Sequence, residues 1–341
     1  MQQAWGEVQI RRLSTAIGSD RIFVLDNATP DGRWLVGANQ PQKFIGTAKP
    51  SYAVLLNVQT GTLRTMHELT NSHSQILAAS SDEHWVVWSE VDDMGTFFNW
   101  RMLAYSLDTG AVHEVARAVR VDGLPVSGPS PYPVVSHGMV VWGQALSNME
   151  PGKEPQKAVV RMADLTRGTV TTLATSAFGP AFSWPWVAWW KASSTAGVIE
   201  VRNLTSGRRW QVDRRPAAIA LAGPTLAFND SDSLAMYLVD DVAADQTPRL
   251  ITRGEDIADH LEWPTASERL IAWNQSTTTQ VYDRLEHRLV ELPVPTAHSG
   301  AGVYGRLLVW FNAIPGQVAP PETELPEHVL VVDISNLPVR P

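Results

Sequence analysis

Six polar side chains stand immediately before short apolar segments of this chain, where they could transfer protons or hold a metal ion. They are His73, Tyr132, Arg215, Asp259, His260 and His298. Imidazole titrates near neutral pH and is a common metal ligand, so three histidines at comparable places would make one such site if they converged. The alternative is that isolated polar residues at loop starts cap strands or meet solvent. Nothing in the sequence fixes the distances between them.

A second candidate site is the acidic and aromatic stretch from Glu90 to Trp100. Its carboxylates and rings are Glu90, Asp92, Asp93, Phe97, Phe98 and Trp100. Rings that stack on a sugar or peptide, with carboxylates that set its orientation, would form a ligand-binding wall. The spacing of carboxylates in a calcium-binding loop is absent, so no metal is predicted here. The alternative is a long connection whose aromatic side chains fold back onto the sheet.

The fourteen tryptophans raise the question of a sugar-binding stripe. Five of them, however, stand at the same place in successive apolar segments: Trp88, Trp142, Trp189, Trp273 and Trp310. A recurring position favours packing between neighbouring sheets, where large rings fill the widening gap. The sequence therefore predicts that these tryptophans belong to the core.

The elements that would position all these residues are short β-strands, which recur along the whole chain. In the clearest copy, Trp85–Trp88 and Met102–Leu107 are apolar runs typical of buried strands, and Asp108-Thr109-Gly110 forms a turn. Glycines at the corresponding turns recur at intervals compatible with the ~40–50-residue period of four-stranded propeller blades. No amphipathic helical pattern of useful length separates the copies, which argues against alternating strands and helices.

Seven copies can be followed, and the seventh supplies only three strands. The segment Val8–Leu13 alternates apolar and polar residues and has no copy of its own. If this strand completes the last blade, at 301–337, the ring closes without a free edge. The sequence thus predicts an all-β, seven-bladed β-propeller of four-stranded antiparallel blades, forming one domain over 1–341. Six or eight blades remain alternatives, because the fifth and sixth copies lack the Thr-Gly turn.

The segment Asn27–Val36 resembles the PD40 repeat of TolB-like, WD40-like β-propellers. Its Thr29-Pro30-Asp31-Gly32 turn before an apolar strand is the signature of that repeat, and Ser80–Trp88 is a degraded version of it. Leu107–Gly110 and Leu204–Gly207 match its second half. The resemblance implies an interaction platform in a bacterial cell envelope or a gating domain beside a peptidase. It supplies no catalytic residues, and no Gly-x-Ser-x-Gly elbow is present.

Composition excludes several classes of function. The formal net charge is −8 and no basic run occurs, so nucleic acid is not an expected partner. The chain has no Cys, which excludes disulfides, thiolate metal sites and cysteine nucleophiles. The longest strongly apolar run, Pro180–Trp190, is too short to span a bilayer. The start after Met1 fits a trimmed leader as well as a cytoplasmic N-terminus. We expect a monomer that is periplasmic or secreted.

The function expected from these patterns is that of a non-enzymatic binding module or scaffold. It would recognise a protein, peptide or glycan at the face bearing the long insertions, which include 143–156 and 311–327 as well as Glu90–Trp100. No cofactor is expected. The alternative is a polysaccharide lyase or hydrolase with a His/Tyr/Arg site at the channel mouth. That alternative uses His73, Tyr132, Arg215, His260 and His298, by analogy with propeller-shaped lyases.

Overall fold

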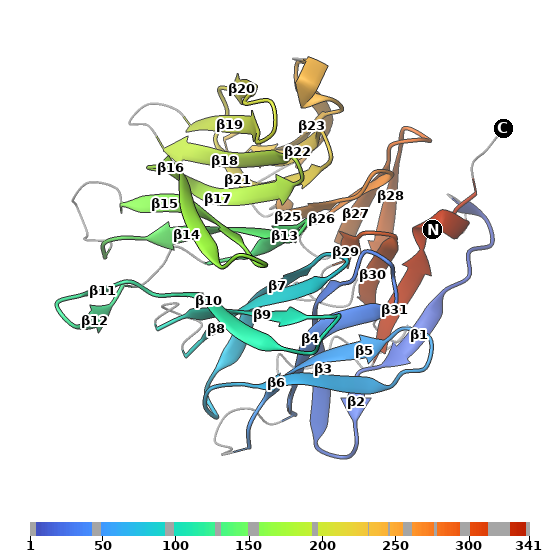
Figure 1. The fold of residues 1–341 in the computed structure, drawn as a ribbon. Coiled ribbons are helices and arrows are strands. Elements are labelled where there is room, and N and C mark those ends of the chain that lie inside the picture. Colours follow the sequence, from blue (N-terminus) through green and yellow to red (C-terminus); the bar gives the residue numbers. More distant parts are fainter. Residues whose placement is uncertain are drawn as a thin grey trace.

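The computed structural model is an all-β propeller with seven antiparallel sheets arranged radially around a central channel (Figure 1). It describes residues 5–42, 49–92, 99–126, 131–148, 157–192, 197–230, 232–244, 246–254, 261–275, 278–293, 301–312 and 328–338. Within these ranges the regular elements are strands and two 3-10 turns, η1 (Val242–Ala244) and η2 (Ile334–Asn336). No described helix is both long and apolar enough to cross a membrane.

Each blade is a meander in which consecutive strands pair. The first four blades comprise β2 (Ala16–Ile17), β3 (Arg21–Ala28), β4 (Trp34–Pro41), β5 (Tyr52–Asn57) and β6 (Leu63–Glu68); β7 (Gln75–Ser81), β8 (Trp85–Val91), β9 (Arg101–Ser106) and β10 (Val112–Arg117); β13 (Val134–Ser136), β14 (Met139–Ala145), β15 (Ala158–Asp164) and β16 (Thr169–Thr175); and β17 (Phe178–Ser183), β18 (Trp186–Ala192), β19 (Gly197–Asn203) and β20 (Arg209–Val212).

The remaining blades follow the same plan. They comprise β21 (Pro216–Ala222), β22 (Thr225–Asp230), β23 (Ala235–Val239) and β24 (Arg249–Arg253); β25 (Leu261–Ala266), β26 (Leu270–Gln275), β27 (Thr278–Asp283) and β28 (Arg288–Pro293); and β29 (Ala301–Tyr304), β30 (Leu307–Asn312), β31 (His328–Asp333) and β1 (Arg11–Ser14). The predicted count of seven blades is confirmed, including the two copies that lack the Thr-Gly turn.

The ring closes as the sequence predicts, with a strand from the start of the chain in the last blade. β1 runs antiparallel to β31, with Arg11 opposite Val331 and Leu13 opposite Val329. The predicted bounds of this strand were 8–13, whereas pairing begins at Arg11. The reason is that Val8 packs its side chain against the core of blades 6 and 7, so the chain joins the sheet edge only after that contact. Closure removes the sheet edge that would invite aggregation.

The first strands of the blades line the channel and contact one another in an unbroken circle. β3 contacts β7, β7 contacts β13, and so on through β17, β21, β25 and β29, which returns to β3. Chain direction then defines two faces. Connections from second to third strands, and from each blade to the next, emerge on one side, which we call the loop-bearing face. The turns between first and second strands and between third and fourth strands form the opposite face.

On the opposite face a turn with a side-chain cap recurs in blade after blade. In blade 1 the side chain of Asn57 accepts hydrogen bonds from the backbone of Gln59 and Thr60, and Gly61 takes φ of 69°. Asp164 and Asn203 cap equivalent turns before Gly168 and Gly207. In blade 6 Asp283 does the same, with His287 taking the positive φ instead of glycine. The capping side chain therefore marks this turn even where Thr-Gly is missing.

The recurring tryptophans of the second strands are core residues, as predicted. Their exposed fractions range from 0% to 4%. They are Trp88, Trp142, Trp189, Trp273 and Trp310. Each lies in an apolar cluster that joins strands of neighbouring blades, so the rings fill the space between sheets.

Two additions to the repeat were not predicted. β2 adds a fifth strand to the channel side of blade 1 by pairing with β3. A short hairpin of β11 (Arg120–Val121) and β12 (Leu124–Pro125) follows blade 2 and projects from the ring (Figure 1). Asp122 and Gly123 take positive φ at its tip, which is the usual geometry of a two-residue hairpin turn.

Replacing Gly305 with alanine is expected to destabilise the protein by at least about 1 kcal/mol, because the turn in blade 7 approaches blade 1 closely. Gly305 has φ of 53°, and a Cβ there would lie 2.4 Å from the Cα of Pro30. Gly18→Ala is the matched control, since Gly18 has φ of 66° but open space around it. Urea unfolding should show the larger loss for Gly305→Ala. Equal losses of stability in the two variants would mean that the positive φ alone, and not the close approach to Pro30, requires glycine at position 305.

Candidate functional site

Three of the five residues predicted for a catalytic mouth are described, and all three precede first strands on the loop-bearing face. His73 is exposed, and its backbone N–H donates to the Asn71 side chain over 2.8 Å. Arg215 is exposed as well, while Tyr132 is half-buried. Among the described residues no contact joins these three to one another. His260 and His298 lie outside the described residues, as does Asp259, so their convergence stays a prediction.

The predicted histidines could also have formed a metal centre. Within the described ranges, no group of three or more His, Asp or Glu side chains is arranged to hold an ion. His73 is the one described member of the predicted His cluster, and no acidic or imidazole side chain of another described residue bonds to its ring.

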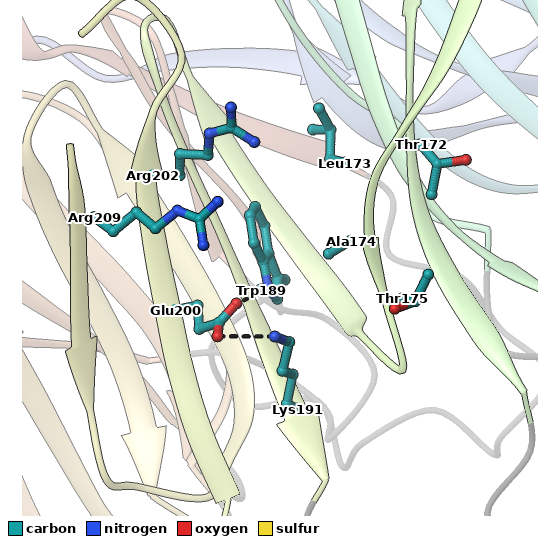
Figure 2. Close-up of a pocket in the computed structure, with 9 residues that line it drawn as sticks. All are labelled: Thr172, Leu173, Ala174, Thr175, Trp189, Lys191, Glu200, Arg202 and Arg209. Carbon is teal, nitrogen blue, oxygen red and sulfur yellow. Dashed lines mark hydrogen bonds and ion pairs between the residues drawn. The ribbon is translucent and has the colours of Figure 1, made fainter. Parts of the chain in front are cut away.

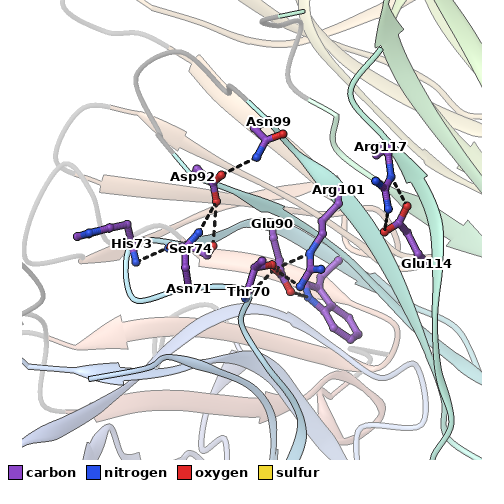
Figure 3. A network of polar contacts seen from close by, with 11 residues as sticks. Thr70, Asn71, His73, Ser74, Glu90, Asp92, Asn99, Arg101, Glu114 and Arg117 are labelled. Atoms are coloured by element: carbon purple, nitrogen blue, oxygen red, sulfur yellow. Dashed lines mark hydrogen bonds and ion pairs between the residues drawn. The ribbon is translucent and has the colours of Figure 1, made fainter. Parts of the chain in front are cut away.

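The carboxylate of Glu90 connects the segment that precedes blade 2 with the second and third strands of that blade. Glu90 is 2% exposed and accepts hydrogen bonds from the Thr70 hydroxyl over 2.7 Å and from the Trp88 indole over 3.2 Å. It also forms an ion pair with Arg101, Nη2 to Oε2, at 3.0 Å (Figure 3). A buried carboxylate is tolerated only with such partners. Glu90 therefore has a positioning role that the sequence did not reveal.

Asp92 lies closer to the surface and organises the adjoining loop. Its Oδ1 accepts from Asn71 Nδ2 and from the Ser74 hydroxyl, each over 3.0 Å, and its Oδ2 accepts from Asn99 Nδ2 over 2.7 Å (Figure 3). Both oxygens are thus occupied by neutral donors of the chain itself. A ligand that used Asp92 would have to share or displace these amides.

The ring of Trp100 points inward. Trp100 is 2% exposed and packs in the cluster between blades 2 and 3, beside Met102 and Val140. This is the folded-back arrangement stated above as the alternative for that aromatic. Asp93, Phe97 and Phe98 lie outside the described residues. Ligand binding by this stretch as a whole stays a prediction.

An aromatic pair at the channel mouth, one ring of which is exposed, was not predicted. Trp263 of β25 is 53% exposed, and its ring meets that of Tyr132 edge-to-face, with 5.4 Å between centroids. Tyr132 precedes blade 3 and Trp263 opens blade 6, and two intervening blades separate them along the ring. Because first strands line the channel, these rings meet across its opening. The sequence contained one signal for this position. Among the described residues, Trp263 is the only tryptophan that lies on the first strand of a blade, and Pro264 follows it directly.

The backbone holds Trp263 in an unusual conformation. Its φ is 48°, inside a bulge where the register of β25 and β26 shifts between Glu262 and Thr265. A bulky residue with positive φ is a genuine outlier and costs about 1–2 kcal/mol. Such strain, combined with an exposed large ring, is characteristic of positions kept for function.

Deeper in the channel one carboxylate stands without a donor. Asp26 lies at a bulge of β3, where the register with β4 shifts between Leu25 and Asn27. No hydrogen-bond donor among the described residues reaches it, and burial raises the pKa of Asp26 to about 7. Burial, and then the charge of Asp26, also raise the pKa of Tyr304. The channel therefore carries an acid that changes charge near neutral pH.

No protein-family model matches the sequence, and a comparison with curated proteins finds no match. Solved structures do match. The propeller domain of the Trilobed protease from Pyrococcus furiosus aligns with a TM-score of 0.56 at 7% identity, over 89% of this chain and 92% of that one. That domain has an open velcro topology, whereas β1 and β31 pair here.

Two further matches illustrate how broadly the fold is used. A prolyl endopeptidase aligns with a TM-score of 0.56 at 10% identity, over 86% of this chain and 46% of that one. An oligogalacturonate lyase in complex with manganese aligns with a TM-score of 0.52 at 12% identity, over 96% of this chain and 90% of that one. At these identities the likeness shows the fold alone: this chain is a seven-bladed β-propeller.

Beyond the fold that the matches above already show, the comparisons do not test the TolB resemblance. TolB from Acinetobacter baumannii aligns with a TM-score of 0.44 at 11% identity, over 91% of this chain and 85% of that one. The turn that suggested the resemblance does form: Gly32 N–H donates to the Thr29 carbonyl over 2.9 Å, and the Thr29 hydroxyl donates to Asp31 over 2.6 Å. Membership of that family stays an expectation from the sequence.

Proposed function

We propose that this propeller is a non-enzymatic binding module that engages a protein, peptide or glycan partner at its loop-bearing face. Trp263, with Tyr132 beside it, is the anchor of that interaction. Two observations support this proposal: the side chain of Trp263 is 53% exposed at the channel mouth, and its backbone has the strained positive φ of 48°. Folding alone favours burial of so large an apolar ring, so a position that costs strain and leaves it exposed is best explained by a ligand.

The geometry of the pair suits recognition. The interplanar angle of 87° means that Tyr132 supports the indole of Trp263 without covering both of its faces. Rigid aromatic rings contribute large contact area with little loss of conformational entropy, and they dominate the energetics of many interfaces. A sugar ring, a proline or another aromatic ring is the natural group to stack on the open face.

A lyase or hydrolase at the same mouth would need at least two of His73, His260 and His298 in one pocket, with Tyr132 or Arg215 nearby. Among the described residues, the ring of Tyr132 contacts Trp263 rather than His73 or Arg215. No specific observation therefore favours catalysis. The expectation of a periplasmic or secreted, monomeric protein accompanies this proposal unchanged.

Trp263→Ala is expected to weaken binding about tenfold or more, the usual cost of removing an aromatic anchor. Ligands would first be selected on the native protein from a displayed peptide library and a panel of soluble polysaccharides, and then measured by calorimetry. Trp184→Ala is the control, because Trp184 is 38% exposed on the opposite face. Equal affinity of both variants would contradict the proposal. So would release of unsaturated or shortened products from the polysaccharides, which would indicate an enzyme.

A further inference from the structure

A cleft of about 290 Å³ separates blades 3 and 4 at the periphery of the ring, away from the channel (Figure 2). One wall is the end of β16, from Thr172 to Thr175. The other wall is the face of blade 4, where Trp189, Lys191, Glu200, Arg202 and Arg209 line the space. The volume corresponds to about ten water molecules, which is the size of a monosaccharide rather than of a polymer segment.

Two cations of the cleft face each other without a counter-ion. Arg202 of β19 and Arg209 of β20 are directly opposite in the register of the sheet, so their side chains share one face. Like charges in this arrangement destabilise a sheet. Among the described residues no carboxylate pairs with either guanidinium, and the Nε of Arg202 is buried with no hydrogen-bond acceptor. Both guanidiniums lie toward the cleft in Figure 2.

Among the described residues that line the cleft, Glu200 is the one carboxylate, and it does not neutralise the two arginines. Glu200 accepts from Lys191 Nζ and from the Trp189 indole, each over 2.8 Å, and from Gln211 Nε2 over 2.9 Å. Burial raises the pKa of Glu200, but the hydrogen bonds from Lys191 and Trp189 outweigh this and hold it below its usual range. Glu200 is therefore ionised and already satisfied, and the net charge of the lining stays positive in a protein whose overall charge is −8.

We propose that this cleft binds a small organic anion of monosaccharide size, whose carboxylate or phosphate is held by Arg202 and Arg209. Two adjacent guanidiniums match the bidentate hydrogen bonding of a planar or tetrahedral oxyanion. The remaining atoms of the ligand would lie against Leu173 and Ala174, within reach of the Thr175 hydroxyl. This site is separate from the channel mouth, so its failure would leave the proposed function of Trp263 intact.

The test uses calorimetry and thermal unfolding of the full chain with four probes: galacturonate, glucose 6-phosphate, inorganic phosphate and neutral galactose, at constant ionic strength. At least one of the two sugar anions should bind and raise the melting temperature, while galactose should not. Whichever of them binds more tightly assigns the oxyanion as carboxylate or phosphate. Binding of inorganic phosphate alone, an adventitious ion only, would overturn the proposal, as would equal effects of galactose.

Three variants distinguish a binding site from a structural one. Arg209→Ala and Arg202→Met, which keeps the apolar stem, should each weaken anion binding at least tenfold. Arg253→Ala, at an exposed arginine of β24, should leave it unchanged. Without ligand, the first two variants should melt at or above the native temperature, because one of two opposed charges is gone. Lower melting of both, or undiminished binding, would overturn the proposal.

Discussion

Asp283→Ala is expected to lower the free energy of unfolding by about 3–5 kcal/mol, the usual result of removing one member of a buried ion pair. The side chain of Asp283 is fully buried and accepts from Arg269 Nη2 over 3.0 Å and from the Trp5 indole over 2.9 Å. The substitution would leave the Arg269 guanidinium, only 12% exposed, without its counter-ion.

The position of the Asp283–Arg269 ion pair in the propeller explains why its loss should destabilise the protein. Trp5 is 2% exposed and lies in the core of blades 6 and 7. Arg269 also donates to the carbonyls of Leu337 and Pro338, over 2.8 and 2.9 Å. Asp283 therefore holds segments from near both ends of the described chain against blade 6, beside the closure formed by β1 and β31. Breaking this ion pair should destabilise the propeller at the place where the ring closes.

Urea unfolding followed by circular dichroism measures the effect, with Asp164→Ala as the matched control. Asp164 caps the equivalent turn of blade 3, but the only cation paired with it among the described residues is Arg167, whose side chain is 80% exposed. The control should therefore lose only about 1 kcal/mol, the contribution of ordinary hydrogen bonds. Equal losses in the two variants would show that the turn, and not the buried ion pair, carries the energy.

The ion pair of Asp283 should also make the free energy of unfolding depend on pH. Burial raises the pKa of Asp283, but the hydrogen bonds from Arg269 and Trp5 outweigh it and hold the pKa below its usual range. A depressed folded pKa means that the stabilisation is complete above the pKa of an unfolded aspartate, about 3.9, and is lost as pH falls through the folded value. The penalty of Asp283→Ala should accordingly shrink in strong acid.

The architecture was readable from the sequence because its determinants are local. The Thr29-Pro30-Asp31-Gly32 turn precedes the second strand of blade 1, and Asx-capped turns separate third and fourth strands in several blades. Tryptophans recur at the same place in five of the second strands. The start of β1 was placed too early because Val8 packs against the core of blades 6 and 7 before the chain joins β31, and alternation in Val8–Leu13 does not show this contact. The hairpin β11–β12 was missed because strands of two residues carry no periodic signal.

The site residues were less readable, because their roles depend on contacts between blades. An acidic aromatic stretch looks the same whether Glu90 meets a ligand or, as found, Thr70 and Trp88. Trp263 is exposed because a bulge reverses the alternation of β25, which no periodicity predicts. Arg202 and Arg209 flank a recognisable turn, so their pairing follows from the sequence. That no described carboxylate pairs with them does not follow from the sequence, since either neighbouring blade could have supplied one.

Asp26→Asn is expected to stabilise the protein by about 2–4 kcal/mol at pH 8 and to give almost no gain near pH 4. Burial raises the folded pKa of Asp26 to about 7, whereas an unfolded aspartate titrates near 3.9. Between these values the folded chain keeps a proton that the unfolded chain has released. Stability therefore falls as pH rises from about 4 to about 7, and the loss persists above that. A neutral amide of the same shape escapes this penalty.

Melting temperatures of the native protein and the variant, measured from pH 4 to pH 8, test this directly. The difference should grow with pH and level off above about pH 7. Asp213→Asn, at an exposed carboxylate of the loop-bearing face, controls for the change in net charge. A gain that is constant across the range would mean that the amide improves packing in the channel, and that Asp26 has the same pKa in the folded and the unfolded chain. A gain that grows would establish a channel whose charge switches near neutral pH beneath the Trp263 mouth.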